Sequence, residues 1–300
     1  MIPPRPPSGE HQDRRSDKPG PAASSAYQVA VAGSLDSWDA AIGRCSVGGT
    51  TMSDPERFLP SRHGFAFSNA WPSQPAVVLS THFGQITIGN AAAGLCGGMV
   101  FVALDYWHAA IVPPTARPSP AEPLYRQIVQ RLIESWNLPA GVARYYECMT
   151  MPDGDTGLDV LGRRIVIYQG LARRTVEAQW PQIRADLDRG VPAPLGVVTV
   201  ASPRPADLAL NHQVLAYDYD RSGAEVSVRV YDPNRGQRDD IWIRFDDSRS
   251  ARSPAITHNL GIGRPVRGFF RTAYAPAPIA GPPSGSPSGV PNPASSMPGR

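Results

Sequence analysis

The apolar positions of the chain follow helical spacing in its first two thirds. Residues 96–108 read CGGMVFVALDYWH, in which nearly every position is apolar or aromatic, and this predicts a helix buried on most sides. Apolar residues four apart predict an amphipathic helix over 124–137, and a third helix is expected over 175–190 with Gly190 at its end. Residues 57–92 are short apolar pieces cut by Pro, Gly and Asn, which favours loops with one or two short strands.

Beyond residue 190 the pattern changes to the short, β-branched and aromatic runs that are typical of strands. Helices followed by a series of strands joined by short turns indicate an α+β fold with a C-terminal antiparallel sheet. The predicted strands are LGVVTV, HQVLAYDY, EVSVRVYD, DIWIRF and VRGFFRTAY.

Two of these strands, within residues 211–234, predict a hairpin. With a three-residue loop ending at Gly223, residues whose numbers sum to 444 lie opposite each other, so that His212 faces Asp232. Directly opposite Cβ atoms lie about 4.5 to 5.5 Å apart, which allows a side-chain hydrogen bond. One face of this hairpin carries valines and is expected to be buried, and the other is mostly polar.

Composition divides the chain into a folded domain and two tails. Residues 1–26 and 275–300 hold 14 of the 33 prolines and almost no large apolar residues. Such segments bury too little surface to offset chain entropy, so both are expected to be disordered. A single domain is expected over residues 27–274.

The charge pattern argues against several partners. The formal net charge is only +3, without a dense run of Lys or Arg in the core, so nucleic acid is not expected as a partner. The sequence offers neither an apolar span long enough for a bilayer nor a Sec-type signal at its start. We expect a protein without a membrane span that is cytoplasmic or exported by a route without such a signal.

The cysteines and most histidines give no metal or disulfide pattern. Cys45, Cys96 and Cys148 are odd in number and widely spaced, which argues against a zinc site or a disulfide framework. We expect Cys45 and Cys148 to be buried apolar residues. His63, His82, His108 and His258 lack metal-ligand spacing, and DGDTGLDV at 153–160 is expected to be a turn rather than a calcium loop. Neither metal nor cofactor is expected.

Cys96 differs from the other two cysteines in its surroundings. It lies between glycines at the predicted start of a buried helix, a position that favours access by a substrate. Helix N-termini and neighbouring imidazolium groups stabilise thiolates, and His212 and Asp232 can supply the imidazolium and the group that orients it. The backbone N–H of Cys96 is a candidate donor to an oxyanion.

These residues, in this order along the chain, resemble the papain-like cysteine peptidases. The similarity covers residues 57–274 and is greatest to bacterial bacteriocin-processing, double-glycine peptidases, whose His strand and Asp strand resemble NHQVLAYDY and VRVYDPN here. The resemblance implies a papain-like fold with the nucleophile on a central helix. Papain-like enzymes carry an oxyanion-binding Gln six residues before the nucleophile; Asn90 stands there, with Asn69 as the competitor. Asn234 is the second candidate to orient the histidine.

The expected function is hydrolysis of a peptide or amide bond through Cys96, His212 and Asp232 and a thioester acyl-enzyme, with a peptide or protein as substrate. One alternative uses the same triad for acyl transfer or glutamine deamidation, as some toxins of this fold do. Another is a catalytically inactive module in which the cleft only binds a peptide.

Overall fold

The computed structural model describes residues 56–71, 77–81, 84–88, 94–248 and 254–279, which all belong to the second of the two units of the chain, residues 43–300. The described helices are α1 (Pro60–His63), α2 (Cys96–His108), α3 (Pro123–Ser135), α4 (Ala140–Thr150), α5 (Leu171–Arg174) and α6 (Trp180–Asp188), with a π-helical turn at Thr175–Gln179 and a 3₁₀ helix at Pro205–Leu210. The strands are β1 (Val77–Thr81), β2 (Gly84–Ile88), β3 (Thr156–Val160), β4 (Arg163–Tyr168), β5 (Ala193–Val198), β6 (His212–Ser222), β7 (Glu225–Tyr231), β8 (Trp242–Asp246), β9 (Thr257–His258) and β10 (Gly268–Arg271).

A six-stranded sheet built from the second half of the chain organises the fold. Its strand order is β10-β5-β6-β7-β8-β9, and every neighbouring pair is antiparallel. The five strands predicted after residue 190 all lie in this sheet, and the helices α2 to α6 precede it in the chain. The α+β class is therefore confirmed.

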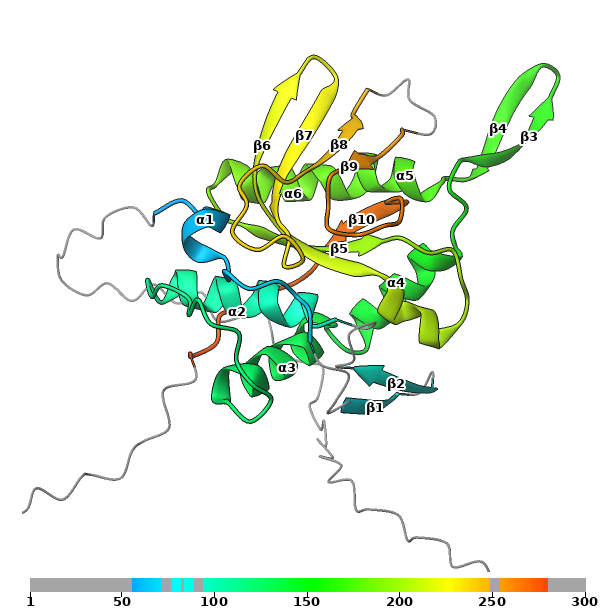
Figure 1. Cartoon of the computed structure of the whole chain (residues 1–300). Helices are drawn as coiled ribbons and strands as arrows, with labels where there is room; N and C mark the ends of the chain where they lie inside the picture. Colours follow the sequence, from blue (N-terminus) through cyan, green and yellow to red (C-terminus); the bar gives the residue numbers. More distant parts are fainter. Residues whose placement is uncertain (1–55, 72–76, 82–83, 89–93, 249–253, 280–300) are drawn as a thin grey trace, which may run out of the picture. The chain divides into compact units, whose positions relative to one another are not determined.

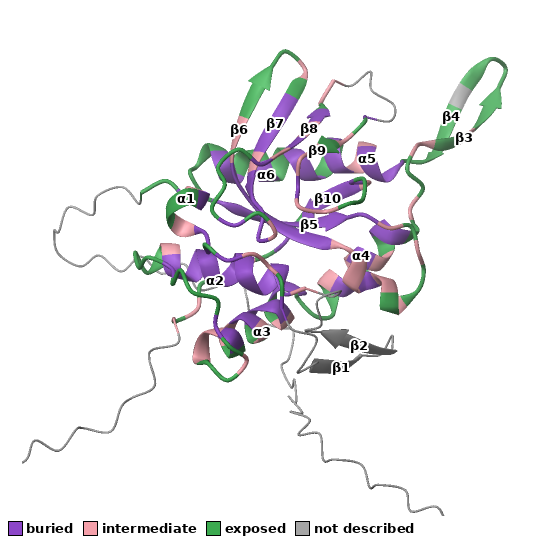
Figure 2. Cartoon of the chain, in the orientation of Figure 1, coloured by how far each residue is buried: buried purple, intermediate pink, exposed green. Residues whose placement is uncertain are grey.

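Helix α2 packs against one face of this sheet. Its residues from Cys96 to Tyr106 are all buried, as the continuous apolar pattern predicts (Figure 2). Two glycines in its first turn allow this close packing. A Cβ on Gly97 would come 2.4 Å from the Gln213 side chain on β6, and one on Gly98 would come 1.9 Å from the Ile128 carbonyl oxygen on α3.

The sheet is buried on both faces over the first part of the β6–β7 hairpin, which the sequence pattern did not predict. Val214 and Val228 pack with Trp180 and Ile183 of α6 in one apolar cluster. On the opposite face, where mostly polar contacts were expected, Leu215, Tyr217 and Tyr231 belong to the cluster that contains α2. The expectation of a polar second face is wrong there, because the central helix covers it.

The helix predictions are partly confirmed. The helix expected at 124–137 is α3, and the one expected at 175–190 is the end of a longer helical run, 171–188, with Gly190 at φ +70° just after it. Helix α4 was not predicted. The segment 153–160, expected to be a turn, contains β3, which pairs with β4 in a hairpin that extends away from the sheet and exposes its side chains (Figures 1 and 2).

The folded part extends past residue 274, where the sequence placed the start of a disordered tail. Ala277 N–H donates to Asp105 of α2 at 3.0 Å, and Arg131 of α3 donates to the Ala275 carbonyl at 2.7 Å. Ile279 packs against the core. The tail boundary is wrong by these residues because a buried ion pair, invisible in the composition, binds the backbone. The predicted start at residue 27 lies outside the described residues.

The helices of the described segments are short. The most apolar of them, α2, has 13 residues, whereas a bilayer requires about 20. Among the described residues, none of the helices has the length and apolar content that crossing a membrane requires.

Candidate functional site

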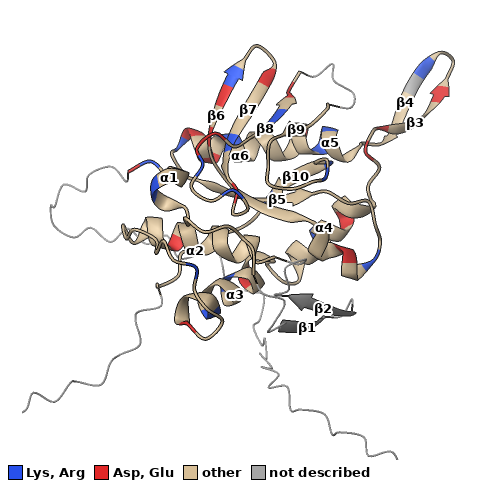
Figure 3. Cartoon of the chain, viewed as in Figure 1, with Lys and Arg blue, Asp and Glu red and all other residues tan. Residues whose placement is uncertain are grey.

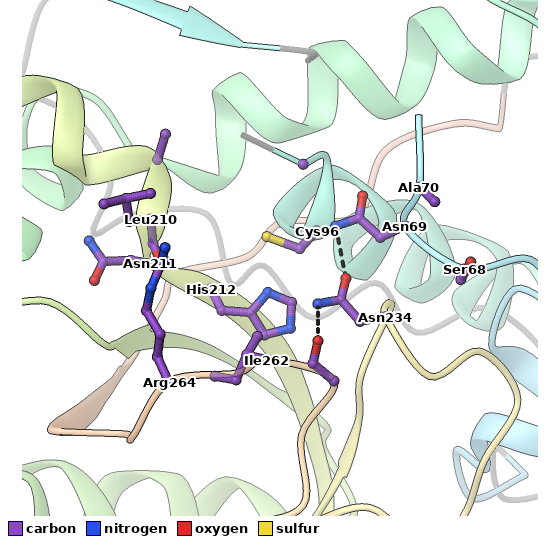
Figure 4. A pocket seen from close by; sticks show the side chains of 13 residues that line it. Ser68, Asn69, Ala70, Cys96, Leu210, Asn211, His212, Asn234, Ile262 and Arg264 are labelled. Carbon is purple, nitrogen blue, oxygen red and sulfur yellow. Dashed lines mark hydrogen bonds between the residues drawn. The ribbon is translucent and has the colours of Figure 1, made fainter. Parts of the chain in front are cut away.

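A cavity of about 350 Å³ lies where the N-terminus of α2 meets the start of β6 (Figure 4). Four other segments complete its walls: the loop after α1, the segment before β6, the turn after β7 and the loop between β9 and β10. The lining residues are Ser68, Asn69, Ala70, Gly94, Cys96, Ala209, Leu210, Asn211, His212, Asn234, Gly261, Ile262 and Arg264.

Cys96 is the first residue of α2 and borders this cavity, with 7% of its surface exposed. The first backbone hydrogen bond of the helix runs from Met99 N–H to Leu95 O at 2.9 Å, so the N–H groups of Cys96, Gly97 and Gly98 come before the helical ladder begins. They give this end of α2 a partial positive charge next to the sulfur. The two glycines that follow Cys96 serve the close packing of α2, whereas the sequence reasoning had linked them to substrate access.

His212, the first residue of β6, forms a buried pair with Asp232, which follows β7. His212 Nε2 lies 2.8 Å from Asp232 Oδ1, and both His212 and Cys96 line the cavity. Burial acts to lower the pKa of His212, but the charges of Asp232 and Cys96 and their hydrogen bonds outweigh it and raise the pKa to about 10. The ring is therefore stabilised as an imidazolium beside the sulfur.

Asp232 is fully buried and fixed by backbone donors on both of its oxygens. Oδ1 accepts the N–H of Asn234 at 2.8 Å, and Oδ2 accepts the N–H of Gly261 at 2.6 Å. Burial acts to raise the pKa of this carboxyl, but the charge and hydrogen bond of His212 and the two backbone donors lower it overall. The carboxylate thus orients His212 and stays ionised.

The hairpin register differs from the predicted one. The turn has two residues, Gly223 and Ala224, and Ser222 pairs with Glu225. A bulge between Ala216 and Asp218 then shifts the register by one residue, so that Leu215 lies opposite Tyr231. His212 and Asp232 are consequently not directly opposite each other. They meet through their side chains across the end of the hairpin.

Asn69, from the loop after α1, lies beside Cys96 with a fixed amide orientation (Figure 4). Its Oδ1 accepts the indole N–H of Trp71 and the backbone N–H of Leu95, both at 2.8 Å. Because both partners are donors only, the Nδ2 group must be the one that donates to Asn234 Oδ1, at 3.1 Å. Its second proton has no acceptor among the described residues. Asn90, the other oxyanion candidate, lies outside them.

Two supporting contacts were not foreseen from the sequence. Asn234, considered as an alternative to Asp232, instead connects the two halves of the site, because its Nδ2 donates to the Gly261 carbonyl at 3.0 Å while its oxygen accepts from Asn69. Tyr145 of α4 donates to the backbone oxygen of His212 at 3.2 Å. No local sequence signal indicated either contact, since both join segments that are distant in the chain.

The remaining cysteine and histidine candidates lie elsewhere. Burial is the main reason that the pKa of Cys148 rises to about 11, and His63 accepts the N–H of Leu59 at 2.9 Å. His108 stacks on Tyr274, and His258 interacts with the Arg264 carbonyl. Within the described ranges, His, Cys, Asp and Glu side chains form no group of three that could hold a metal. Cys45 and His82 fall outside these ranges.

Comparison of the chain with protein-family models, with curated proteins and with solved structures found no match. Any functional assignment must therefore come from the residues around Cys96 and their geometry. That geometry combines a thiol at a helix N-terminus, an imidazolium oriented by a buried carboxylate, and an amide group facing the same cavity.

Proposed function

We propose that the protein is a papain-like cysteine hydrolase that cleaves a peptide or amide bond, with Cys96 as nucleophile, His212 as acid and base, and Asp232 as the residue that orients His212. One observation carries this proposal. The His212 ring is fixed by Asp232 at 2.8 Å through Nε2, which leaves its other nitrogen for the Cys96 thiol; Cys96 lines the same cavity and raises the pKa of the ring. This is the nucleophile, base and orienting group of a catalytic triad.

Acylation starts from a thiolate and imidazolium pair, in which His212 already holds the thiol proton. The thiolate attacks the carbonyl carbon of the substrate, and the carbonyl oxygen takes up the displaced electron pair. As the C–N bond breaks, His212 donates its proton to the leaving amine, and a thioester remains on Cys96. Asp232 keeps the ring in place and compensates its charge at each step.

Deacylation uses the same groups in reverse roles. His212, neutral after protonating the amine, removes a proton from a water molecule, the resulting hydroxide attacks the thioester carbon, and the carboxylic acid product leaves as Cys96 is expelled as a thiolate beside the imidazolium. In both tetrahedral intermediates the oxyanion is stabilised by the Cys96 backbone N–H and by the Nδ2 group of Asn69. The support for Asn69 is its amide orientation, set by Trp71 and Leu95.

The experiment that tests this function is digestion of a defined peptide library by the purified full chain, followed by mass spectrometry of the products. We expect fragments from the wild type and none from Cys96→Ala. Cys148→Ala is the matched control, because Cys148 is the other buried free cysteine among the described residues and is expected to keep its turnover. Equal cleavage by wild type and Cys96→Ala, or alkylation of Cys96 by iodoacetamide no faster than that of a free thiol, would remove the support for a hydrolase.

A further inference from the structure

The loop between β9 and β10 brings a guanidinium to the edge of the Cys96 cavity. The loop is attached directly to the triad, because Gly261 N–H donates to Asp232 and the Gly261 carbonyl accepts from Asn234. The carbonyl of Arg264 is in turn held by His258, 3.0 Å away. Arg264 lines the cavity on the side of Leu210 and Asn211, across from Ser68 and Ala70 (Figure 4).

Arg264 is exposed and has no carboxylate within ion-pair distance among the described residues. The β6–β7 hairpin, by contrast, carries residues of both signs, and its Arg229 binds Asp220 at 2.8 Å (Figure 3). The pKa of Asp207 is lowered mainly by a hydrogen bond from Ser202, and the charge of Arg264 also contributes. However, this carboxylate is already bound by Arg204 at 2.9 Å. With no described carboxylate in ion-pair contact, the Arg264 guanidinium remains available to an anionic group at the cavity edge.

The cavity itself offers no negative side chain to compensate this charge, since its lining residues include neither Asp nor Glu. Among the described residues, the guanidinium makes one hydrogen bond, from Nη1 to the Leu210 carbonyl, at 3.2 Å. An arginine has five N–H donors, so four remain for a ligand. Two parallel N–H donors match the oxygens of a carboxylate and give a hydrogen bond stronger than one between neutral groups.

We propose that Arg264 forms a binding subsite for a carboxylate of the substrate, supplied either by an acidic side chain or by a free C-terminus next to the bond that Cys96 attacks. This inference rests on the proposed hydrolase function and adds a substrate class to it. The subsite holds the substrate through charge and two N–H donors, while the triad acts on the neighbouring amide.

Paired alkylating reagents test this subsite without a known substrate. Iodoacetate and iodoacetamide have nearly the same size and reaction, but only the first carries a carboxylate. The rate constant for alkylation of Cys96 is measured with each by site-resolved mass spectrometry, and their ratio is divided by the same ratio for N-acetylcysteine. We expect a normalised ratio of roughly three to ten for the wild type, falling as salt is added.

Variants of Arg264 test whether this residue causes the elevated ratio. The normalised ratio should drop to about one in Arg264→Gln and remain above one in Arg264→Lys, since the charge is kept there. Arg126→Gln is the matched control: Arg126 is also exposed, donates to one backbone carbonyl, that of Ala121, and lies on α3 outside the cavity lining. It should retain the wild-type ratio.

The outcomes separate the two proposals. A wild-type ratio of one, or an elevated ratio that persists in Arg264→Gln, overturns the subsite. Alkylation of Cys96 by the neutral reagent, iodoacetamide, no faster than that of N-acetylcysteine overturns the hydrolase, while the ratio of the iodoacetate and iodoacetamide rates still reports on Arg264. If neither reagent reaches Cys96, both proposals are wrong.

Matched peptides then identify the source of the carboxylate. A Glu to Gln exchange in a peptide with an amidated C-terminus tests a side chain, and exchange of a free for an amidated C-terminus tests the main chain. A decrease in kcat/KM that is confined to one exchange and absent in Arg264→Gln identifies that source. Equal kcat/KM in both exchanges argues against any carboxylate subsite.

Discussion

Two buried carboxylates, Asp232 and Asp105, are each paired with a cation at 2.8 Å, yet only one pair adjoins a thiol. His212, which is paired with Asp232, lines the cavity that Cys96 also lines. Arg131 and Asp105 lie between α2 and α3. The difference shows that a buried ion pair alone does not indicate chemistry. What distinguishes the first pair is its position next to a thiol and a cavity.

The Arg131–Asp105 pair has a structural explanation. Asp105 Oδ1 also accepts the Tyr274 hydroxyl at 2.8 Å and the Ala277 N–H at 3.0 Å. The Arg131 guanidinium packs over the rings of Phe101 and Tyr274. These contacts attach residues 274–277 to α2 and α3. The Arg131–Asp105 pair therefore stabilises the packing of this segment against the two helices.

Asp232→Ala gives the largest effect that we expect. It leaves the His212 imidazolium buried, without a partner and free to turn away from Cys96. Loss of the group that orients a catalytic histidine lowers kcat by about 10⁴-fold in comparable triads. The measurement is kcat for the peptide that the wild type cleaves fastest, with a near-native circular dichroism spectrum as the control for folding. Turnover within tenfold of the wild type contradicts the role of Asp232.

Arg131→Met disrupts the Arg131–Asp105 pair and should lower the stability of the protein without lowering the reactivity of Cys96. The variant leaves the Asp105 carboxylate buried without its cation, which destabilises a protein by about 3 to 5 kcal/mol. We expect this loss in the free energy of unfolding from urea denaturation. At a temperature where the variant is folded, the alkylation rate of Cys96 should match that of the wild type. A loss of Cys96 reactivity in the folded variant would show that the two regions are coupled.

The contrast between the two pairs also shows which parts the sequence predicts. The sequence predicts helix α2 because a helix that is buried on most sides is apolar at nearly every position. It predicts the strands of the large sheet because their short runs are rich in β-branched and aromatic residues. His212 and Asp232 were recognised because they lie near the ends of two adjacent strands. The role of Asp105, by contrast, is not predictable, since nothing local in the sequence indicates its partner Arg131.

Other features depend on contacts between distant segments and were not predictable. The hairpin register is changed by the two-residue turn and by the bulge between Ala216 and Asp218. Neither is visible in the alternation of apolar and polar residues. The position of Asn69 beside Cys96 depends on the packing of Trp71 and Leu95 around its amide. A spacing rule from papain-like enzymes pointed instead to Asn90, which is outside the described residues.

Asn69→Ala tests the oxyanion donor beside Cys96 separately from the His212–Asp232 pair. Removal of one side-chain oxyanion donor costs about 10²- to 10³-fold in kcat, so the effect should be smaller than that of Asp232→Ala. The measurement is kcat and KM for the same peptide, with KM changing little. Asn259→Ala is the matched control, because Asn259 also caps backbone groups, those of Trp242 and Asp240, but away from the cavity. Equal kcat losses in both variants would indicate a structural role for Asn69.

The smallest expected effect concerns the pH dependence of the free energy of unfolding. The His212–Asp232 pair should contribute to it, and the Arg131–Asp105 pair should not. Burial acts to lower the pKa of His212, but Asp232 and Cys96 raise it to about 10. In Cys96→Ala the contribution of Cys96 is removed, and Asp232 still raises the pKa of His212. The stabilisation by protonated His212 is then fully present below pH 6.5, the unfolded value, and is lost as the pH rises toward the folded pKa.

We therefore expect the free energy of unfolding of Cys96→Ala to fall by about 1 to 2 kcal/mol between pH 6 and 8, since each unit of pKa shift corresponds to about 1.4 kcal/mol. Adding His212→Gln should flatten this slope. Adding Arg131→Met should lower the stability at every pH and leave the slope unchanged, because an arginine keeps its proton throughout the range. A slope that persists without His212 would mean that another group titrates on unfolding, and the distinction between the pairs would then rest on Cys96 alone.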